Sequence, residues 1–383
     1  MIAIGRLIAP SSFATMEFAG YDRAARAATA PAADDIVLVD IDQQSLSELG
    51  PWPWPRSIHA DLLARLQSAQ TRVVAFTTPL GAPQNARETE RLQAALNLLE
   101  ASDLGSSEQA EKLRSLLKAA GNDPDASLAT AMAAHGNVVL PIEVRIGNSS
   151  DAAVPLPASM VVTASPAALA AAQSASVVRP LSPRLAGAAQ AVGHTYLSPD
   201  SDGVIRTDRA AVKVGTILLP SLAAAIAARA VEPDRLAFPS ASALRVGERT
   251  ITLDGPLNIR PHFLHPNSHS PVHYSYSQVL AGAVPADALR GKIVLIGLAD
   301  PDATVATPVH RTTSPQLVIA STVASLVSGE VYARPTSAVI AEWLVAIGVI
   351  LFAAFVLPAA GPGLAALATV LVAAILVIVD VGL

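Results

Sequence analysis

Short apolar runs separated by helical patterns dominate the first part of the chain. Residues 36–42 (IVLVDID) combine branched apolar side chains with two carboxylates at the exit, as in a buried strand. From Ser57 to Gln70 leucines recur at helical spacing, and a second apolar run follows at 72–76. A strand, a helix and another strand predict a βαβ unit, with a parallel strand pair and a right-handed crossover.

The alternation of strands and helices continues to about residue 330. Further strands are expected at 137–143 and 292–296, a β-ribbon at 204–214, and a strand pair at 244–253 around the turn residue Gly247. Further helical patterns lie at 86–100, 107–119, 125–135, 221–231 and 317–328. The predicted fold class is therefore α/β, with a mixed sheet, βαβ crossovers and antiparallel additions.

The C-terminal tail has a different pattern. From Trp343 to Val379 there are 37 uncharged residues, a helix of about 55 Å against a hydrocarbon core of about 30 Å. Pro358 and the Gly361-Pro-Gly363 string interrupt this run. The α/β part is therefore predicted to be followed by a transmembrane helical hairpin, with spans 338–357 and 364–383. A pair of buried core helices is the alternative.

The N-terminal segment, residues 1–33, starts with an apolar stretch that Arg6 interrupts. Its longest uncharged part, 7–16, is too short for a membrane span or a convincing signal peptide. We expect an amphipathic entry helix, or the end of a membrane helix that begins outside this chain. Residues 34–334 are then predicted to form one domain.

Composition removes several classes of function. Apolar residues make up 51% and charged residues 15% of the chain, which agrees with a membrane-associated protein. The net charge of −5 offers no basic surface for phosphates, so nucleic acid is not an expected partner. There is no cysteine, which excludes disulfides, thiolate metal sites and cysteine nucleophiles.

Several strings in a fixed order carry a family resemblance. They are Ile36-Val-Leu-Val-Asp-Ile-Asp42, Gly50-Pro-Trp-Pro-Trp-Pro-Arg-Ser-Ile-His59, Gly193-His-Thr-Tyr196, Pro199-Asp-Ser-Asp-Gly-Val-Ile-Arg206, Tyr274-Ser-Tyr-Ser-Gln-Val-Leu-Ala-Gly282, Leu289-Arg-Gly-Lys-Ile-Val-Leu-Ile-Gly297, Thr307-Pro308 and Ala324-Ser-Leu-Val-Ser-Gly329. Together they span about 21–334 and resemble the CHASE-type extracellular sensory domain, second class, of bacterial membrane receptors.

The resemblance implies a receptor of the bacterial inner membrane, with 34–334 as a sensory domain on the periplasmic or extracellular side. It further implies an unknown small-molecule ligand, and a second copy or another membrane signalling protein as partner. Such receptors usually have one membrane helix before the sensor, about three after it, and a cytoplasmic output domain. This chain has two predicted spans and no output domain, so we expect a fragment, a divergent member, or a protein that contacts another membrane protein.

Local departures from the family pattern bear on the ligand. After the second strand the family usually has an acidic residue, where this chain has Thr77 and Thr78. Near the end of the domain, Pro315-Gln316 and Ala320-Ser-Thr322 replace the family's Pro-Gly and His-Ala-Asn. If those groups bind ligand in the family, this chain is expected to bind a different ligand or none.

Asp40, Asp42 and Arg56 are the predicted ligand-binding residues. The two carboxylates leave the end of a predicted parallel strand, where open α/β sheets bind ligands. Arg56 follows the proline-tryptophan string and could present a guanidinium to an acidic ligand. The alternatives are structural: a helix cap and turn for the two aspartates, and for Arg56 an ion pair with Asp40 or Asp42, which is the favoured interpretation.

Two groups of residues resemble metal sites, but a structure without metal is favoured for both. Imidazole binds zinc, nickel and copper, but the prolines between the clustered histidines break any regular spacing, so a solvated loop is favoured. Asp200, Asp202 and Gly203 resemble a calcium loop but lack the later acidic ligands, which favours a β-turn. The clustered histidines are His262, His265, His269 and His273.

No catalytic motif is present, so the chain is predicted not to be an enzyme, to need no cofactor, and to act by signalling. The helix from Leu317 to Ser328 leads through Arg334 and Pro335 to the first predicted span, and its displacement would be the signal. The alternative function is a structural or partner-binding membrane protein with the same fold and no small-molecule ligand.

Overall fold

The computed structural model describes residues 10–80, 94–102, 107–120, 124–147, 162–179, 181–232, 235–265, 270–333, 336–356 and 363. Contacts divide the chain into two compact units. One is Thr29–Tyr332, and the other joins Met1–Ala28 with Ala333–Leu383.

A mixed sheet of seven strands, counted over the described residues, forms the centre of Thr29–Tyr332. Its order is β14-β1-β15-β2-β3-β5, and β6 also pairs with β3. All neighbours are parallel except β3 and β5. The bounds are β1 (Ile36–Ile41), β2 (Val73–Phe76), β3 (Val138–Ile146), β5 (Ala175–Arg179), β6 (Ala191–His194), β14 (Val272–Ser275) and β15 (Ile293–Leu298).

The predicted α/β class with a mixed sheet is confirmed, but one predicted pairing is wrong. β1 and β2 are joined through α4 as expected, yet they are not neighbours, because β15 lies between them. β15 is buried along nearly its whole length and bonds to a strand on each side. A central strand can come from far along the chain, and local patterns carry no information on such long-range pairing.

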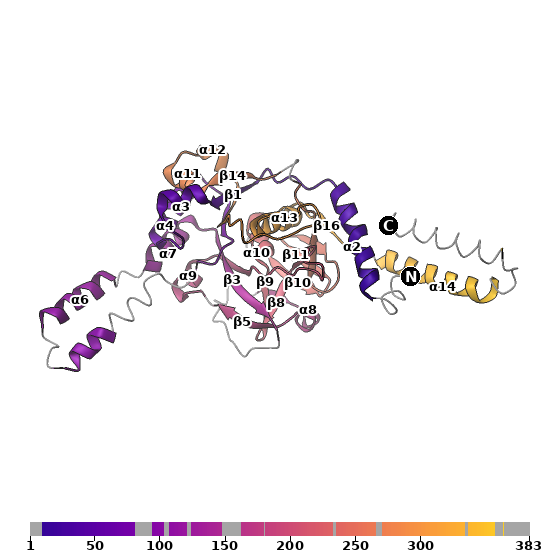
Figure 1. Cartoon of the computed structure of the whole chain (residues 1–383), viewed down its shortest axis with the longest axis horizontal. Coiled ribbons are helices and arrows are strands. Elements are labelled where there is room, and N and C mark those ends of the chain that lie inside the picture. The colour runs from indigo at the N-terminus through magenta and orange to yellow at the C-terminus, as the bar shows by residue number, and fades with distance from the viewer. Residues whose placement is uncertain are drawn as a thin grey trace. The chain divides into compact units, whose positions relative to one another are not determined.

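Alternate residues of the central strands enter two separate cores. Val37 and Val39 face one core, whereas Ile36 and Leu38 face the other. The first core is covered by α3 (Gln43–Leu49), α4 (Arg56–Ser68), α7 (Pro124–His135), α9 (Pro183–Ala188) and α11 (Tyr276–Ala281). The second is covered by α10 (Leu222–Val231) and α13 (Pro315–Ser328). The result is a three-layer α/β/α arrangement (Figure 1).

A smaller sheet covers the outer side of α10. It has the order β12-β11-β10-β4, and its Phe238, Leu244 and Ile251 pack with Ala224 and Ala227 of the helix. Because α10 is enclosed by two sheets and α13, residues 222–228 are all buried. The bounds are β4 (Thr163–Ala164), β10 (Leu236–Ser240), β11 (Ala243–Val246) and β12 (Arg249–Thr252).

The remaining elements complete this unit. A second small sheet has the order β16-β13-β7, and β8 and β9 form a ribbon. The bounds are β7 (Asp208–Arg209), β8 (Ala211–Val214), β9 (Ile217–Pro220), β13 (Asn258–Pro261), β16 (Val331–Tyr332), α6 (Glu108–Ala120), α8 (Pro166–Ala171) and α12 (Ala286–Leu289).

The other unit contains α2 (Pro10–Ala27) and α14 (Thr336–Leu351), which continues as a π-helical turn, Phe352–Val356. α14 has 16 residues, about 24 Å of helix, which is shorter than the hydrocarbon core. In the part of the chain that is described, no helix has both the length and the apolar character to cross a membrane. The predicted hairpin is therefore not seen; its second span, 364–383, lies outside the described residues.

Candidate functional site

The main sheet carries a hydrogen-bonded aspartate–histidine pair from two neighbouring strands, toward the carboxyl end of β1. β1 and β14 run parallel, with Leu38 opposite His273 and Asp40 opposite Ser275. Oδ2 of Asp40 lies 2.7 Å from Nδ1 of His273. The hydrogen bond to Asp40 raises the pKa of His273, and burial opposes this effect. The imidazole is half exposed, so this pair is accessible to solvent.

Asp42 has a structural task at the same edge. Its carboxylate Oδ1 accepts from the Ser45 backbone amide at 2.8 Å, the Ser45 hydroxyl at 2.6 Å and the Ser275 hydroxyl at 2.8 Å. These bonds make Asp42 the N-cap of α3 and join that helix to β14. Burial raises the pKa of Asp42, but the hydrogen bonds from Ser45 and Ser275 outweigh it and lower the pKa overall. The carboxylate is therefore occupied by local donors.

Arg56 is buried and does not join the two aspartates. Its Nε lies 3.0 Å from Oδ1 of Asp125 at the start of α7, and the side chains of both are 4% exposed. Nη1 of Arg56 also donates to the Leu80 carbonyl. The expected structural ion pair exists, but the partner differs from the predicted Asp40 or Asp42. A guanidinium enclosed in this way is poorly placed to meet a ligand.

His59 belongs to a buried aromatic cluster that sequence reasoning missed. It lies at the helical spacing of Leu62, Leu63 and Leu66 on α4, so the pattern alone places it on the buried face. Nδ1 of His59 lies 2.8 Å from the Tyr276 hydroxyl. Burial, with a contribution from the Arg56 charge, lowers the pKa of His59 to about 3. The rings of Trp52, Trp54, Phe76 and Tyr276 surround it.

At the ends of β2 and β15, the sheet edge is lined by neutral groups. Thr77 Oγ1 donates to the Ile296 carbonyl at 3.1 Å, and Thr78 Oγ1 accepts from the Leu298 amide at 2.9 Å. The Gln316 amide donates to the Leu295 carbonyl at 2.8 Å. A Cβ at Gly297 would lie 2.7 Å from Gln316 Oε1, so a side chain does not fit there. Thr77, Thr78 and Gln316, where the sequence departs from the expected family pattern, thus make neutral hydrogen-bond and packing contacts.

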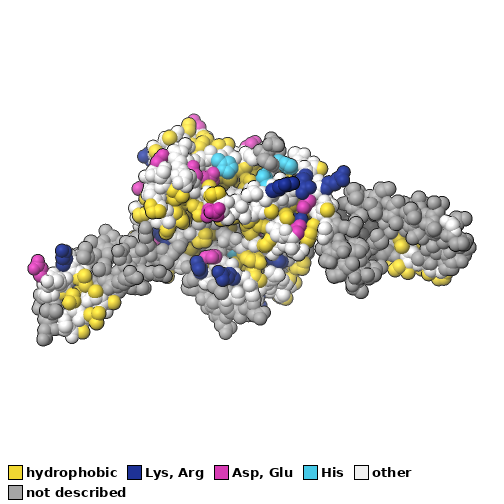
Figure 2. Space-filling model, viewed as in Figure 1, with side chains coloured by type: hydrophobic (Ala, Val, Ile, Leu, Met, Phe, Trp, Pro, Cys, Tyr) yellow, Lys and Arg dark blue, Asp and Glu magenta, His cyan; other side chains and the backbone are white. Residues whose placement is uncertain are grey.

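The clustered histidines do not form a metal site in the described residues. His273 pairs with Asp40, whereas the His262 ring stacks on Tyr332 with centroids 3.8 Å apart. His269 lies outside the described residues. No three potential metal ligands come together in the ranges that the structure covers. The histidines visible in Figure 2 likewise reach the surface at separate places.

The Asp200 to Gly203 segment is a β-turn and its carboxylates already have a cation. The Gly203 amide donates to the Asp200 carbonyl at 2.9 Å, which closes the turn. The buried Arg206 donates to Asp200 at 3.0 Å and to both oxygens of Asp202 at 2.9 and 2.8 Å. Arg206 lowers the pKa of Asp202, against the effect of burial. This guanidinium takes the place that the calcium alternative assigned to a metal.

The predicted coupling helix, α13, is held along its length by the chain before it. The Ser314 hydroxyl caps its start by accepting from the Leu317 amide at 3.2 Å. Farther along, Ser321 Oγ accepts from the Leu264 amide at 3.2 Å, and Ser325 Oγ accepts from the His262 amide at 2.9 Å. Through these two hydrogen bonds, the backbone of residues 262–264 acts as a clamp on α13.

The end of α13 leads directly to the boundary of the unit. Gly329 ends the helix in a left-handed conformation, and β16 follows at Val331–Tyr332, paired with β13. The predicted coupling residues Arg334 and Pro335 lie outside the described residues, and α14 begins at Thr336. By chain connection, α13 is thus the last helix before the segment predicted to enter the membrane.

Comparison with known proteins places the chain in a family. The family model of the CHASE2 domain matches residues 1–358, most of the chain. No curated protein and no solved structure gives a match. The matched range includes the sheet, the aromatic cluster around His59 and α13. The chain belongs to the CHASE2 domain family, the extracellular sensory domains of signalling receptors.

Proposed function

We propose that this chain is the membrane-anchored, extracytoplasmic ligand-sensing part of a bacterial signal-transduction receptor. Family membership supports a sensor on the periplasmic or extracellular face of the inner membrane. The uncharged run 343–379 supports anchoring by the segments 338–357 and 364–383. The sensor itself carries out no catalysis, and the output domain is outside this chain.

The observation that carries the proposal is the connection of α13. Its residues contact β13, β15 and α10, and it is followed within eight residues by the start of α14. Ligand binding that favours one position of α13 would displace the chain that leaves it at Ser328. The signal then passes through Arg334 and Pro335 to the membrane segment.

Location can be tested without knowing the ligand. Alkaline phosphatase, which matures only outside the cytoplasm, is inserted after Tyr332 of the full chain, so that the segments 338–357 and 364–383 still follow it. High phosphatase activity is expected, and a green fluorescent protein fused at the same position should remain dark. A bright fluorescent fusion with inactive phosphatase would contradict the extracytoplasmic assignment.

Coupling is tested in a chimera in which the chain is joined to a cyclase output. Two glycines inserted between Arg334 and Pro335, or the charge reversal Arg334→Glu, should uncouple the output from stimulus. The matched control is the same insertion after Gly215, in the exposed turn between β8 and β9. Unchanged signalling after the break at Arg334 would show that this route is wrong.

The partner is proposed to be a second copy of the chain or another membrane signalling protein. Rotation or shift of two subunits about their interface is one way in which a binding event is transmitted, and it requires a partner. Crosslinking of the full chain in membranes is expected to give a species of twice the mass, or a mixed species with another membrane protein. Recovery of the monomer alone would contradict this part.

A further inference from the structure

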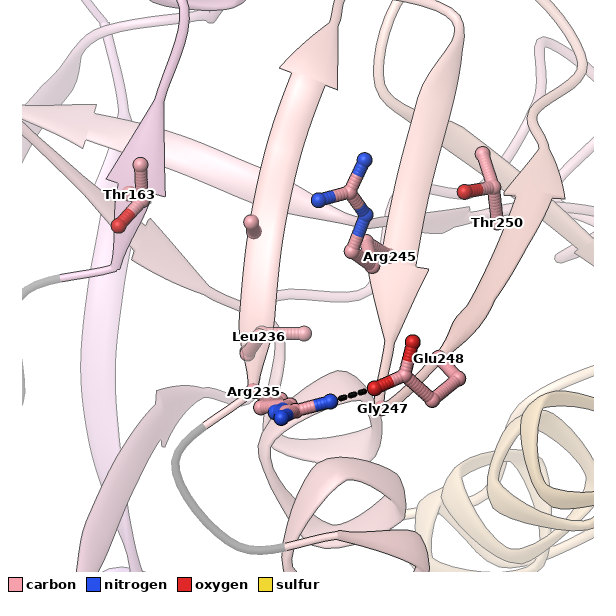
Figure 3. Close-up of a pocket in the computed structure, with 8 residues that line it drawn as sticks. Thr163, Arg235, Leu236, Arg245, Gly247, Glu248 and Thr250 are labelled. Carbon is pink, nitrogen blue, oxygen red and sulfur yellow. Dashed lines mark ion pairs between the residues drawn. The ribbon is translucent and has the colours of Figure 1, made fainter.

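The solvent face of the small sheet has one row of side chains that crosses all four strands. Thr163 is opposite Ala237, Ala237 opposite Arg245, and Arg245 opposite Thr250. Directly opposed residues in a sheet point to the same face. The next residues, such as Leu244, point the other way and pack toward α10. The row forms the floor of an open pocket of about 530 Å³ (Figure 3).

The charges in this pocket leave one guanidinium open. Arg235 is held by Glu232, 3.0 Å from its Nε, and by Glu248, the ion pair dashed in Figure 3. Arg245 is exposed and makes no ion pair with any residue in the described ranges. In Figure 3 its guanidinium extends away from the Arg235–Glu248 pair, and Thr250 lies on the neighbouring strand. The pocket thus presents the N–H donors of the Arg245 guanidinium, which have no ion-pair partner in the described ranges, on the strand next to the Thr250 hydroxyl.

This arrangement selects the charge and shape of its ligand. A guanidinium binds planar carboxylates through two parallel hydrogen bonds. Arg235 and Arg245 balance Glu232 and Glu248, so a doubly charged phosphate would bring excess negative charge close to Glu248. The Ala237 side chain offers apolar surface beside Arg245. We propose that this pocket binds a small organic monocarboxylate, with the carboxylate on Arg245 and the apolar part over Ala237.

The pocket is also connected to the coupling helix. Arg249 precedes Thr250 in β12, and its Nη1 donates to the carbonyls of Val327 at 3.2 Å and Ser328 at 3.0 Å. Adjacent residues of a strand point to opposite faces, so one strand joins the pocket to the last turn of α13. A ligand that orders β11 and β12 would hold Arg249 more firmly on that turn. This inference rests on the proposed function, because it names the ligand site of the same sensor.

Hydrogen exchange followed by mass spectrometry tests binding and coupling together. The full chain in detergent micelles is titrated with sodium propionate, and with sodium phosphate at equal ionic strength. At ten times the propionate Kd, exchange of amides in 243–252 is expected to slow by about tenfold, and exchange in 325–329 is expected to slow as well. Phosphate should give no such protection.

Three variants separate the steps. Arg245→Gln should raise the propionate Kd by about tenfold or more, whereas Arg179→Gln, at an exposed arginine on another sheet, should leave it unchanged. Arg249→Gln should keep the protection of 243–252 and lose that of 325–329.

The proposal is overturned by an absence of protection with propionate, by equal protection in Arg245→Gln, or by stronger protection with phosphate. Protection of 325–329 that survives in Arg249→Gln would disprove the connection to α13. A chimera whose output still follows its stimulus after Arg245→Gln would keep the proposed function and exclude this pocket.

Discussion

The two helical layers on either face of the main sheet are built from different kinds of residue. On the α4 side, large side chains such as Trp54 and Leu62 pack in one core, and the same layer contains the buried Arg56–Asp125 pair. On the α10 and α13 side, alanines pack closely and hydroxyls such as Ser325 bond to backbone. Interlocked large side chains fix a position, whereas closely packed small residues permit small sliding movements. The first layer is thus suited to be a fixed frame and the second to move.

The largest expected effect comes from breaking the buried ion pair of the frame. Asp125→Asn leaves the Arg56 guanidinium buried without its counter-charge, which should lower the free energy of unfolding by about 3 to 5 kcal/mol. Urea denaturation of the full chain, followed by tryptophan fluorescence, measures this loss.

The matched control is Glu143→Gln, which breaks the exposed pair with Arg179 and should cost less than about 1 kcal/mol. Equal losses in Asp125→Asn and Glu143→Gln would mean that the α4 layer is no more firmly fixed than the surface.

The next largest effect is expected in the pH dependence of stability, to which His59 and Asp208 contribute with opposite signs. The pKa of His59 is about 3 in the folded chain and about 6.5 when unfolded, so its contribution is complete above pH 6.5 and is lost as the pH falls. At pH 5 this loss is about 2 kcal/mol, from 1.5 pH units at about 1.36 kcal/mol each. His59→Gln should flatten the change in urea midpoint between pH 7 and pH 5.

Asp208, which lies near the start of α10, has the opposite effect on the pH dependence of the free energy of unfolding. Burial raises its pKa to about 7, above the ordinary 3.8, although the Ser221 hydrogen bond opposes this. The folded chain therefore gains stability as the pH falls from 7 toward 3.8. Asp208→Asn should make the acid loss steeper, while His59→Gln makes it shallower. If both variants changed the slope of stability against pH in the same direction, the opposite pKa shifts assigned to His59 and Asp208 would be contradicted.

Local patterns predicted the elements of this fold but not how they combine. The apolar runs at 36–42, 72–76 and 292–296 are β1, β2 and β15, because both faces of these strands are buried and the sequence shows it directly. That β15 separates β1 from β2 depends on pairings more than 200 residues apart, for which no local signal exists.

The candidate site shows the same limit at the level of single side chains. Capping by Asp42, one of the two alternatives that the sequence predicts for this residue, follows from its place before α3. The partner of Arg56 lies 69 residues away on another helix, so sequence pointed to the nearer aspartates instead. The ligand-binding roles of Asp40, Asp42 and Arg56 stay predictions. The sequence does not predict a ligand-binding role for Arg245, since one arginine in a short hairpin resembles any exposed surface residue.

A smaller effect is expected from loosening the clamp on α13. Ser325→Ala removes the acceptor of the His262 amide and should cost about 1 to 2 kcal/mol. The sharper readout is local: exchange of amides in 262–264 should accelerate, while peptides of α4 remain as slow as before. Ser47→Ala, at an exposed hydroxyl of α3, is the control. Acceleration throughout both layers would mean that α13 does not move separately from the frame.

The smallest effect is expected at the exposed end of α13. Arg249→Gln weakens the cap on the Val327 and Ser328 carbonyls and should lower stability by about 0.5 kcal/mol, because a cation at a helix C-terminus is worth little when solvent screens it. Arg249→Lys, which keeps the charge, should restore part of this loss. In the receptor chimera, however, Arg249→Gln should change the output far more than the stability. A small change in output that merely follows the stability would show that the end of α13 is an ordinary helix terminus, and that the second layer is as fixed as the first.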